Sequence, residues 1–405
     1  MPKYPQVRDI KLILDANNSS DFDEKNSSKK ENVVIIIPTY NEASVIQTTI
    51  EQVFASVEPT DQYEVHILIF DSASTDNTQQ IVASLQNNHP NLHLCNEPQK
   101  SGLGSAYLQA MNYALTSLNA DIIFEFDADL SHQPKYIRPI LDMLQTCDCV
   151  LGSRYVDGGS IPNDWALHRK LFSVLGNYVA RAVLTPKYKD FTSGFRATRR
   201  QQLLKILPHR FLTNNYAYKM QLLWLLHKNK AKIREYPIDF IDRNEGYSKL
   251  PKNSIIDSLR VVFTLRYHEV KRYLKMCFVG SLGIAVQFIT YNTLRKYFHF
   301  TPFDASQIAV CAAIINNFIL NNKITFSDKN KTSWPLKTKR LLIFTIYSIF
   351  IINMQSYWLR FGVLCFGGGA LRENIIMGTG MGLMSLLNYY AYSRHIWAEK
   401  LVPSN

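Results

Sequence analysis

The first two thirds of the chain alternate short, wholly apolar runs with longer stretches in which apolar and polar residues mix. Short continuous runs rich in β-branched residues are typical of buried strands, and the chain has them at 33–37, 65–70, 92–95, 121–126 and 233–237. Five helices are predicted: one at about 43–57, one that includes Ile81 and Leu85, one that ends at about Leu118, and two at about 166–184 and 215–227. Strands that alternate with helices indicate a parallel sheet covered by helices. The sequence therefore predicts an α/β domain.

The last third is dominated by four apolar segments, at about 276–294, 305–322, 341–359 and 374–393. Each approaches the ~20 residues that a helix needs to cross a bilayer. We therefore expect an all-α membrane domain of four transmembrane helices, with the lipid bilayer as a partner.

Apolar residues recur every three or four positions just before the first of these segments, at Ile256, Leu259, Phe263, Tyr267, Val270 and Leu274. This spacing predicts an amphipathic helix over 253–275. Its basic flanks suit a helix that lies on a membrane surface. A helix packed on the α/β domain is the alternative.

Basic residues outnumber acidic ones, 45 to 33, which gives a net charge of +12. An excess of this size points to anionic partners, such as phosphates, nucleic acid or an anionic membrane surface. Many of the basic residues flank the apolar segments, in particular Lys271, Arg272, Lys275 and the connection 323–340. Because these flanks account for much of the excess, nucleic acid is not an expected partner.

The distribution of charge also predicts an orientation. Basic flanks stay on the cytoplasmic side of a membrane, so we expect a multi-pass membrane protein with the α/β domain and both termini in the cytoplasm. Residues 1–31 are mostly polar and lack the apolar core of a secretory signal, and we expect them to form a disordered tail. The six cysteines are scattered, which suits reduced thiols in a reducing compartment.

Polar clusters follow three of the predicted strands. Asp127 and Asp129 come directly after the run 121–126, while Pro38-Thr39-Tyr40 and Asp71 end two other strands. Ligands of parallel sheets bind at the carboxyl ends of the strands, so these clusters should converge. Carboxylate oxygens suit Mg²⁺ or Mn²⁺, which proteins typically hold by one or two carboxylates plus substrate phosphates. For an isolated Asp-x-Asp, a plain polar turn is the alternative.

Seven short motifs appear in order along the α/β domain. They are Pro38-Thr39-Tyr40-Asn41-Glu42, Asp71-x-x-Ser74-x-Asp76-x-Thr78, Gly102-Leu103-Gly104-Ser105-Ala106, Asp127-Ala128-Asp129-Leu130-Ser131-His132, Gly152-Ser153-Arg154-Tyr155, Ser193-Gly194-Phe195-Arg196 and Arg243-x-x-Gly246-x-Ser248-Lys249. As a set, over about 32–250, they resemble family 2 glycosyltransferases of the dolichyl-phosphate mannosyltransferase type. The last third resembles the GtrA-like membrane domain often fused to such enzymes.

This resemblance implies a Rossmann-like GT-A fold. The expected organisation is a tail (1–31), a GT-A catalytic domain (32–252), the juxtamembrane helix (253–275) and a GtrA-like transmembrane domain (276–405). The implied reaction is the inverting, metal-dependent transfer of a hexose to a dolichyl or polyprenyl phosphate. Mannose from GDP-mannose is the expected donor sugar, with Mg²⁺ or Mn²⁺ as cofactor.

The resemblance also assigns roles to residues at matching positions. It implies donor nucleotide binding by Pro38, Tyr40, Glu42, Asp71, Asp127, Arg243 and Lys249. It implies that Asp127 and Asp129 hold the metal and the donor diphosphate, and that Arg154, Arg169 and Ser173 receive the acceptor phosphate. The residues expected to carry catalysis are Asp127, Asp129, Arg154 and Arg243.

Two positions depart from the family pattern. Ser72 stands where the nucleoside motif usually has a second aspartate, and Ser131 stands where some relatives place a glutamine that reaches the metal. A serine hydroxyl is a weaker ligand, so water or phosphate would fill that place. Arg196 is a further cation near the motifs, and it could instead brace the site through Asp190.

The chemistry of such a transfer supports the assignment. The leaving nucleoside diphosphate develops negative charge, which calls for a metal and cations. The nucleophile, a phosphate monoester with a second pKa of about 6, is largely ionised at neutral pH, so a general base is not required. Positioning and charge stabilisation can then carry the rate, and arginines suit this because they bind phosphate oxygens bidentately.

Three alternatives remain open. The same chemistry could use UDP-glucose or UDP-N-acetylhexosamine. A processive polysaccharide synthase would carry a Gln-x-x-Arg-Trp motif, which this sequence lacks. The membrane part could instead be the active element, a transporter or flippase of lipid-linked sugars regulated by the α/β domain. Asn316, Asn317 and Asn388 within apolar segments would then have a role beyond interhelical hydrogen bonding.

Overall fold

The computed structural model describes residues 30–57, 62–162, 165, 167–241, 253–325 and 334–391, and within these ranges it leaves out the side chains at 167–169, 172, 334–342, 345, 385–386 and 388–389. The chain forms two compact units, Met1–Arg266 and Tyr267–Asn405. We call the first the α/β unit and the second the helical unit.

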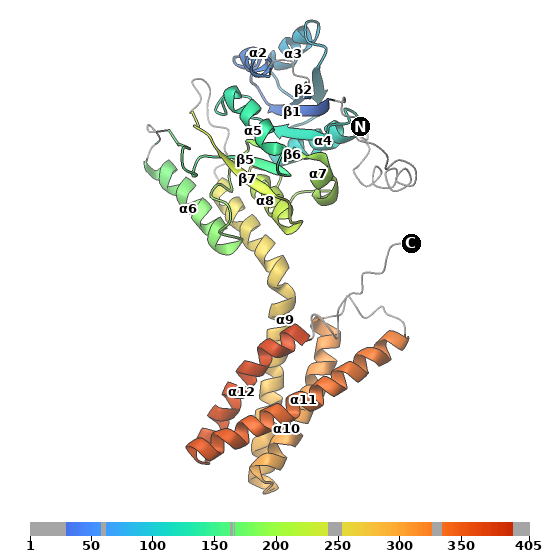
Figure 1. Ribbon diagram of the computed structural model, residues 1–405, viewed down its shortest axis with the longest axis vertical. Coiled ribbons are helices and arrows are strands. Elements are labelled where there is room, and N and C mark those ends of the chain that lie inside the picture. Colours follow the sequence, from blue (N-terminus) through green and yellow to red (C-terminus); the bar gives the residue numbers. More distant parts are fainter. Residues whose placement is uncertain are drawn as a thin grey trace. The chain divides into compact units, whose positions relative to one another are not determined.

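Within the described residues, the α/β unit is built on a seven-stranded sheet of order β3-β2-β1-β4-β6-β5-β7 (Figure 1). The strands are β1 (Glu31–Thr39), β2 (Tyr63–Asp71), β3 (Leu92–Asn96), β4 (Ile122–Glu125), β5 (Cys149–Ser153), β6 (Arg196–Arg199) and β7 (Ile233–Pro237). Strands β1 to β4 are mutually parallel where they pair, and β5 is parallel to β7. Strand β6 is antiparallel to both β4 and β5.

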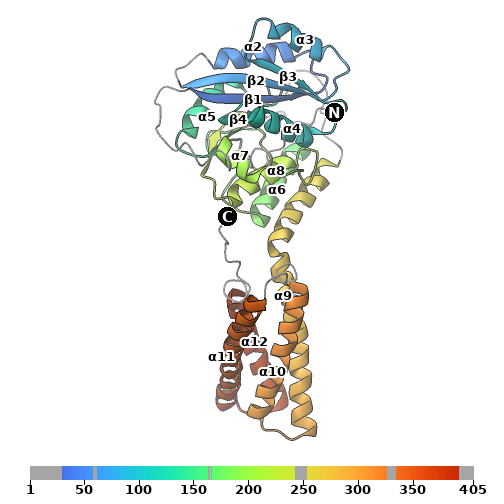
Figure 2. The same cartoon turned by 90° about the vertical axis from the view of Figure 1, so that its right-hand side faces the viewer.

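The sheet is buried on both faces by helices (Figure 2). They are α2 (Ile46–Ser56), α3 (Thr78–Gln86), α4 (Leu103–Thr116), η1 (Pro134–Tyr136), α5 (Ile137–Leu144), α6 (Leu167–Val183), α7 (Arg200–Ile206) and α8 (Tyr218–Lys228). Alternate side chains of a strand point to opposite faces, and β1 shows this clearly. Val33, Ile35 and Ile37 pack with α2 and α5, whereas Val34 and Ile36 pack with α4 and α8.

The predicted strands and helices of the α/β unit are present, with ends that shift by a few residues. The prediction of a parallel sheet was wrong at one place, because β6 runs antiparallel between β4 and β5. Strand β6 has the sequence Arg-Ala-Thr-Arg, which contains no apolar run, so the pattern that revealed the other strands could not reveal it. Its arginines are held by hydrogen bonds instead of apolar packing.

The helical unit contains most of α9 (Ser254–Tyr297), followed by α10 (Pro302–Leu320), the π-helical turn η2 (Asn321–Thr325), α11 (Trp334–Phe366) and α12 (Ala370–Ala391). Within the described residues, three stretches are long and apolar enough to cross a membrane: Ser254–Tyr297, Pro302–Thr325 and Ile346–Phe366. Helix α12 is not among them, so four membrane spans stay a prediction.

Helix α9 presents two apolar faces. Val261, Val262 and Leu265 pack in the α/β unit against residues of α6 and α8. The predicted stripe lies on another face, where Phe263 and Tyr267 are exposed. The alternative of a helix packed on the α/β domain is therefore confirmed for the first part of α9, although residues outside the predicted stripe make that contact.

Candidate active site

The Asp127–Asp129 pair follows directly on the central strand β4. All four side chains of Ile122–Glu125 are buried, and the backbone N–H of Phe126 continues the pairing by donating to the carbonyl oxygen of Ile36 at 3.0 Å. The chain then turns through Leu130, which has a left-handed φ of 57°. Such backbone in a non-glycine residue costs free energy and concentrates at functional sites.

The loops after β1 and β2 turn in the same way. Asn41 and Ala73 also have left-handed φ values, 54° and 57°, so the loop after each of the three neighbouring strands contains a residue in this conformation. The two loops are tied together, because Ser74 Oγ accepts from the N–H of Asn41 at 2.8 Å and Asn41 Oδ1 accepts from the N–H of Thr75 at 2.8 Å. The three polar clusters therefore meet at one edge of the sheet, as the sequence predicted.

Asp127 lies in a ring of polar groups. Its Oδ2 is 3.5 Å from the Nζ of Lys219 and 3.6 Å from Nδ1 of His132, and its Oδ1 accepts from the hydroxyl of Tyr107 at 3.5 Å. The side chain is 25% exposed, so it is held firmly and still faces solvent. Asp129 is also partly exposed, and its Oδ1 accepts from the N–H of Ser131 at 3.1 Å.

Lys219 is a site residue that the sequence analysis missed. It lies on α8, is 6% exposed, and points its ammonium group at Asp127. Gly194 makes room for it, since a Cβ on that glycine would lie 2.1 Å from Nζ. The available signal was a lysine within the mainly apolar stretch Tyr218–Leu223, all of which is buried.

His132 packs beside Asp127. It is buried, and its ring stacks on Phe195 with centroids 4.9 Å apart. Burial lowers the pKa of His132 to about 4, despite the opposing effect of the nearby carboxylate of Asp127. The imidazole is therefore neutral at neutral pH and acts as an aromatic wall.

Asp71 is placed at the expected edge but is fully buried. Its carboxylate accepts hydrogen bonds from Thr39 Oγ1 at 2.8 Å, from the N–H and Oγ of Ser74 at 2.9 and 2.5 Å, and from Gln79 Nε2 at 2.6 Å. It thus joins the ends of β1 and β2 to α3. Its predicted contact with the nucleoside stays a prediction, and within the described structure it organises the loops.

The other predicted donor residues lie beside this loop. Pro38 is in β1, paired with Phe70. Tyr40 follows the strand, and the Nζ of Lys100 lies 3.4 Å from its ring centroid, a cation–π arrangement. The N–H of Glu42 donates to Thr78 Oγ1 at 3.0 Å.

Arg154 forms a bidentate ion pair with Asp190. Its Nε and Nη2 each lie 2.8 Å from one carboxylate oxygen, and Nη2 also donates to Thr192 Oγ1 at 2.6 Å. Burial raises the pKa of Asp190, but the Arg154 guanidinium and hydrogen bonds from Arg154 and Thr192 outweigh it and hold that pKa below its usual range. The alternative that Arg196 braces the site through Asp190 was wrong, since Arg154 takes that place.

Arg196 has its own partner, Glu125 of β4. The pair is fully buried, with Nε–Oε2 and Nη2–Oε1 distances of 2.5 and 2.9 Å. The hydroxyl of Tyr218 donates to the same carboxylate at 3.0 Å. The pair joins β4 to β6, and Tyr218 joins both to α8. Glu125 lies two residues before Asp127, and Tyr218 lies directly before Lys219.

The predicted acceptor residues are only partly described. Ser173 lies on α6, and its Oγ is 2.7 Å from the hydroxyl of Tyr155. Arg169 lies on the same helix, but its side chain is outside the described residues, as are Arg243 and Lys249 altogether. Their roles stay predictions.

The carboxylates present fit a hard divalent cation. Within the described part of the chain, no three His, Cys, Asp or Glu side chains gather as an all-protein metal site. Asp127 and Asp129 supply two partly exposed carboxylates, which is the usual protein contribution where substrate phosphates complete the coordination of Mg²⁺.

Comparisons with known proteins show the family of both units. Residues 34–207 match the glycosyl transferase family 2 model, and residues 275–397 match the GtrA/DPMS transmembrane domain model. The chain is 30% identical to the dolichol-phosphate mannosyltransferase of Pyrococcus furiosus over 380 residues, which cover 90% of this chain and 99% of that one.

A second relative matches the α/β unit. The undecaprenyl-phosphate mannosyltransferase of Micrococcus luteus is 33% identical over 218 residues, 54% of this chain and 87% of that one. Among solved structures, the chain is similar to glucosyl-3-phosphoglycerate synthase from Mycobacterium tuberculosis in complex with Mn²⁺, uridine diphosphate and phosphoglyceric acid. That likeness has 17% identity and a TM-score of 0.43, over 65% of this chain and 82% of that one.

Proposed function

The chain belongs to glycosyl transferase family 2, as a membrane glycosyltransferase with a GT-A-like α/β unit and a GtrA/DPMS transmembrane domain, and from this we propose that it transfers mannose from GDP-mannose to a polyprenyl phosphate of the dolichyl type. The transfer inverts the anomeric carbon and takes place at the cytoplasmic face of the membrane, where both termini lie. The product is a polyprenyl-phosphate mannose. Two relatives that this chain matches over most of their length are named as mannosyltransferases of undecaprenyl phosphate and dolichol phosphate. These names support mannose as the sugar and a polyprenyl phosphate as the acceptor.

One observation carries the proposal: two partly exposed carboxylates, Asp127 and Asp129, follow a buried strand, and Oδ2 of Asp127 lies 3.5 Å from the ammonium nitrogen of the buried Lys219. Asp127 and Asp129 would hold a divalent cation, Mg²⁺ or Mn²⁺, together with the donor diphosphate. A bound divalent cation supplies charge stabilisation for the leaving diphosphate. Lys219 adds a fixed positive charge beside the same carboxylate, and it is well placed to stabilise that developing charge too.

The edge formed by the β1 and β2 loops is the proposed nucleoside site. Tyr40 offers an aromatic face, and Lys100 lies over its ring at 3.4 Å. Asp71 fixes the conformation of these loops by accepting hydrogen bonds from Thr39, Ser74 and Gln79. Pro38 and Glu42 border the same edge, while Arg243 and Lys249 are proposed to hold the donor phosphates.

The acceptor needs no general base, because a phosphate monoester is already largely ionised at neutral pH. The chain therefore has to position it, a role that we propose for Arg154, Arg169 and Ser173. Arg154 uses its Nε and Nη2 to bind Asp190, and its side chain is 9% exposed. It can bind the phosphate only with the part of its guanidinium that is not bonded to Asp190.

Helix α6 supports a lipid acceptor. It exposes a stripe of large apolar side chains at three- and four-residue spacing, namely Leu171, Val174, Leu175 and Tyr178. Ser173 lies on the same helix, bonded to Tyr155. Exposed apolar surface of this kind marks contact with a lipid or a partner, and an isoprenoid chain attached to the acceptor phosphate would fit it.

The decisive experiment is a donor-by-acceptor transfer assay on the full chain in detergent, with Mg²⁺ and Mn²⁺, for the wild type and Asp129→Ala. We expect mannosyl transfer from GDP-mannose to a polyprenyl phosphate, lost in the variant. Transfer from UDP-glucose or UDP-N-acetylhexosamine would keep the site and replace the donor. No transfer from any sugar nucleotide to any polyprenyl phosphate would overturn the proposal and favour a transporter of lipid-linked sugar.

A further inference from the structure

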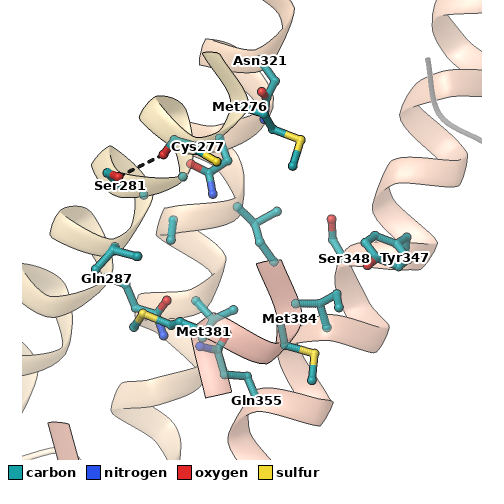
Figure 3. A pocket seen from close by; sticks show the side chains of 18 of the residues that line it. Met276, Cys277, Ser281, Gln287, Asn321, Tyr347, Ser348, Gln355, Met381 and Met384 are labelled. Atoms are coloured by element: carbon teal, nitrogen blue, oxygen red, sulfur yellow. Dashed lines mark hydrogen bonds between the residues drawn. The ribbon is translucent and has the colours of Figure 1, made fainter. Parts of the chain in front are cut away.

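The helical unit contains a partly open cavity of about 260 Å³ between α9, α10, α11 and α12 (Figure 3). Its wall mixes apolar side chains, among them Met276, Ile284 and Met384, with amides and hydroxyls from α9, α10, η2 and α11. The volume lies slightly below the roughly 300 to 1,000 Å³ typical of pockets for drug-sized ligands. It suits a smaller group, such as a single sugar ring.

Four polar side chains of this wall are more than nine-tenths buried: Gln287 on α9, Asn321 on η2, and Ser348 and Gln355 on α11. Figure 3 shows Gln287 and Gln355 reaching into the cavity from these two helices. Within the described part of the chain, Gln287 Nε2, Gln355 Nε2 and Ser348 Oγ are buried and have no hydrogen-bond partner.

Asn317 of α10 adds an acceptor to the same wall. Its Oδ1 is also buried without a partner among the described residues. The side chain packs against α9 where Gly283 leaves room, since a Cβ there would lie 2.3 Å from Oδ1. The amide is therefore held in place by a close helix–helix approach.

Unpartnered polar groups are costly inside a bilayer, where water cannot satisfy them. Four of them around one cavity call for a ligand that satisfies them together. The amide nitrogens donate, Asn317 Oδ1 accepts, and the Ser348 hydroxyl does both, so the ligand must both accept and donate hydrogen bonds. Hydroxyl groups do so.

The wall also sets the charge of the ligand. No Lys, Arg, His, Asp or Glu side chain lines the cavity among the described residues. A phosphate group would find no cation here, and because its oxygens only accept hydrogen bonds it would leave Asn317 Oδ1 without a donor, so the wall favours an uncharged group. Apolar residues alternate with the amides, which suits the apolar face of a sugar ring.

We propose that this cavity binds an uncharged, hydroxyl-rich group the size of one hexose. The group comes either from a free sugar or from the head of a glycosylated lipid. This goes beyond the transfer reaction, and it does not depend on which sugar nucleotide the α/β unit uses.

The test uses the full chain in phosphatidylcholine–phosphatidylglycerol nanodiscs and a photoreactive alkyl mannoside with a diazirine in its alkyl chain. We expect labelled peptides from α9 and α11 in the wild type. Labelling should fall about tenfold or more in Gln287→Leu/Gln355→Leu, because each hydrogen bond lost is worth up to about tenfold in affinity. Gly280→Leu should block it as well, since a side chain there enters open space beside the cavity.

Asn353→Leu is the matched control. This asparagine lies on α11 two residues from Gln355, is exposed, and already donates to the carbonyl oxygen of Ile349 at 2.8 Å. Its variant should label like the wild type. Asp129→Ala should also label like the wild type, because binding in the cavity does not require catalysis. A failure of the proposed transfer reaction would therefore leave the labelling of the cavity unchanged.

Competition identifies the source of the sugar. If octyl mannoside displaces the probe and methyl mannoside does not, the natural ligand is a lipid-linked head group. If both displace it equally, the ligand is a free sugar. Displacement by octyl phosphate as effective as by octyl mannoside would overturn the proposal, as would wild-type labelling of the double variant. A lower thermal midpoint of the Gln→Leu variants would also overturn it, because removing truly unpartnered amides leaves stability unchanged or raised.

Discussion

The ammonium nitrogen of Lys219 lies 3.5 Å from Oδ2 of Asp127. A divalent cation on Asp127 would therefore share this carboxylate with a buried positive charge. Two cations on one carboxylate oppose each other, while both attract a diphosphate. Lys219 should thus weaken the binding of the metal alone and strengthen the binding of metal and diphosphate together.

Lys219→Gln tests this balance. We expect GDP in the presence of Mn²⁺ to bind about tenfold more weakly, because a charge-assisted contact is lost, and Mn²⁺ alone to bind more tightly. Isothermal titration calorimetry measures both. Lys228→Gln, at the exposed end of the same helix, should leave both affinities unchanged. Equal effects of the two substitutions would contradict a specific role for Lys219.

Gly194→Ala should reproduce the loss without removing the charge. A Cβ at this position would lie 2.1 Å from the Lys219 ammonium, so the flexible end of the lysine must move away from Asp127. We expect donor affinity to fall, and the effect to be non-additive with Lys219→Gln in a double-mutant cycle. Gly176→Ala on α6, where a Cβ meets nothing within 4 Å, is the control and should stabilise by up to about 1 kcal/mol.

Asp190 makes stability depend on pH in a defined direction. Its pKa is held below the usual range in the fold, chiefly by Arg154, which outweighs the effect of burial. The stabilisation is therefore complete above the unfolded value of about 3.9 and is lost as the pH falls through the lower folded value. Thermal unfolding of the full chain in detergent should show the wild type losing stability below about pH 4.

Asp190→Asn should destabilise at neutral pH by about 3–5 kcal/mol, because Arg154 stays buried without its counter-charge. The gap to the wild type should narrow as the pH falls below about 4. Asp142→Asn breaks an exposed pair with Arg138 and should change stability by less than about 1 kcal/mol. A pH-independent gap between Asp190→Asn and the wild type would refute the linkage.

The apolar stripe on α6 predicts a difference between acceptors. Leu175→Ser should raise KM about tenfold for a long polyprenyl phosphate, because burying one leucine against lipid is worth about 1.5–3 kcal/mol. It should leave KM for a short, water-soluble prenyl phosphate unchanged. Leu212→Ser, at another exposed leucine, should affect neither. A rise in KM for both acceptors would mean that the helix is disturbed and would not support lipid contact.

Glu125 tests the buried pair that precedes the site. Glu125→Gln should destabilise the fold by about 3–5 kcal/mol, since Arg196 is then buried without compensation. Glu125→Leu/Arg196→Met should recover much of this loss, because two apolar side chains of similar volume leave no unpaired charge. Thermal unfolding in detergent measures both. A double variant less stable than either single one would contradict the argument.

The sequence revealed those parts of the fold that depend on apolar runs. Val33–Ile37 and Ile122–Phe126 are continuous enough to be recognised as strands, and parallel pairing then brings their polar ends together. Strand β6 could not be found in this way, because Arg196 is buried by an ion pair and not by apolar packing. A charged residue at a buried position gives no periodic signal.

The site was predictable in outline and not in its contacts. Asp127 and Asp129 are adjacent to an apolar strand, so their place followed from the local pattern. Lys219 is 92 residues beyond Asp127, and only the packing of α8 against the sheet brings the two within 3.5 Å. The partner of Asp190 was mistaken for the same reason, since two arginines compete for it and tertiary packing decides.

The Glu125–Arg196 pair also limits how this chain can evolve. Loss of either partner alone leaves a buried charge unpaired. The cost in folding free energy is then comparable to about half the stability of a typical domain. A lineage could leave this state only by changing both residues nearly together, or by first acquiring stability elsewhere. The two positions, 71 residues apart, should therefore be inherited as one unit, and β4, the strand that leads directly to Asp127 and Asp129, is fixed in place by the same constraint.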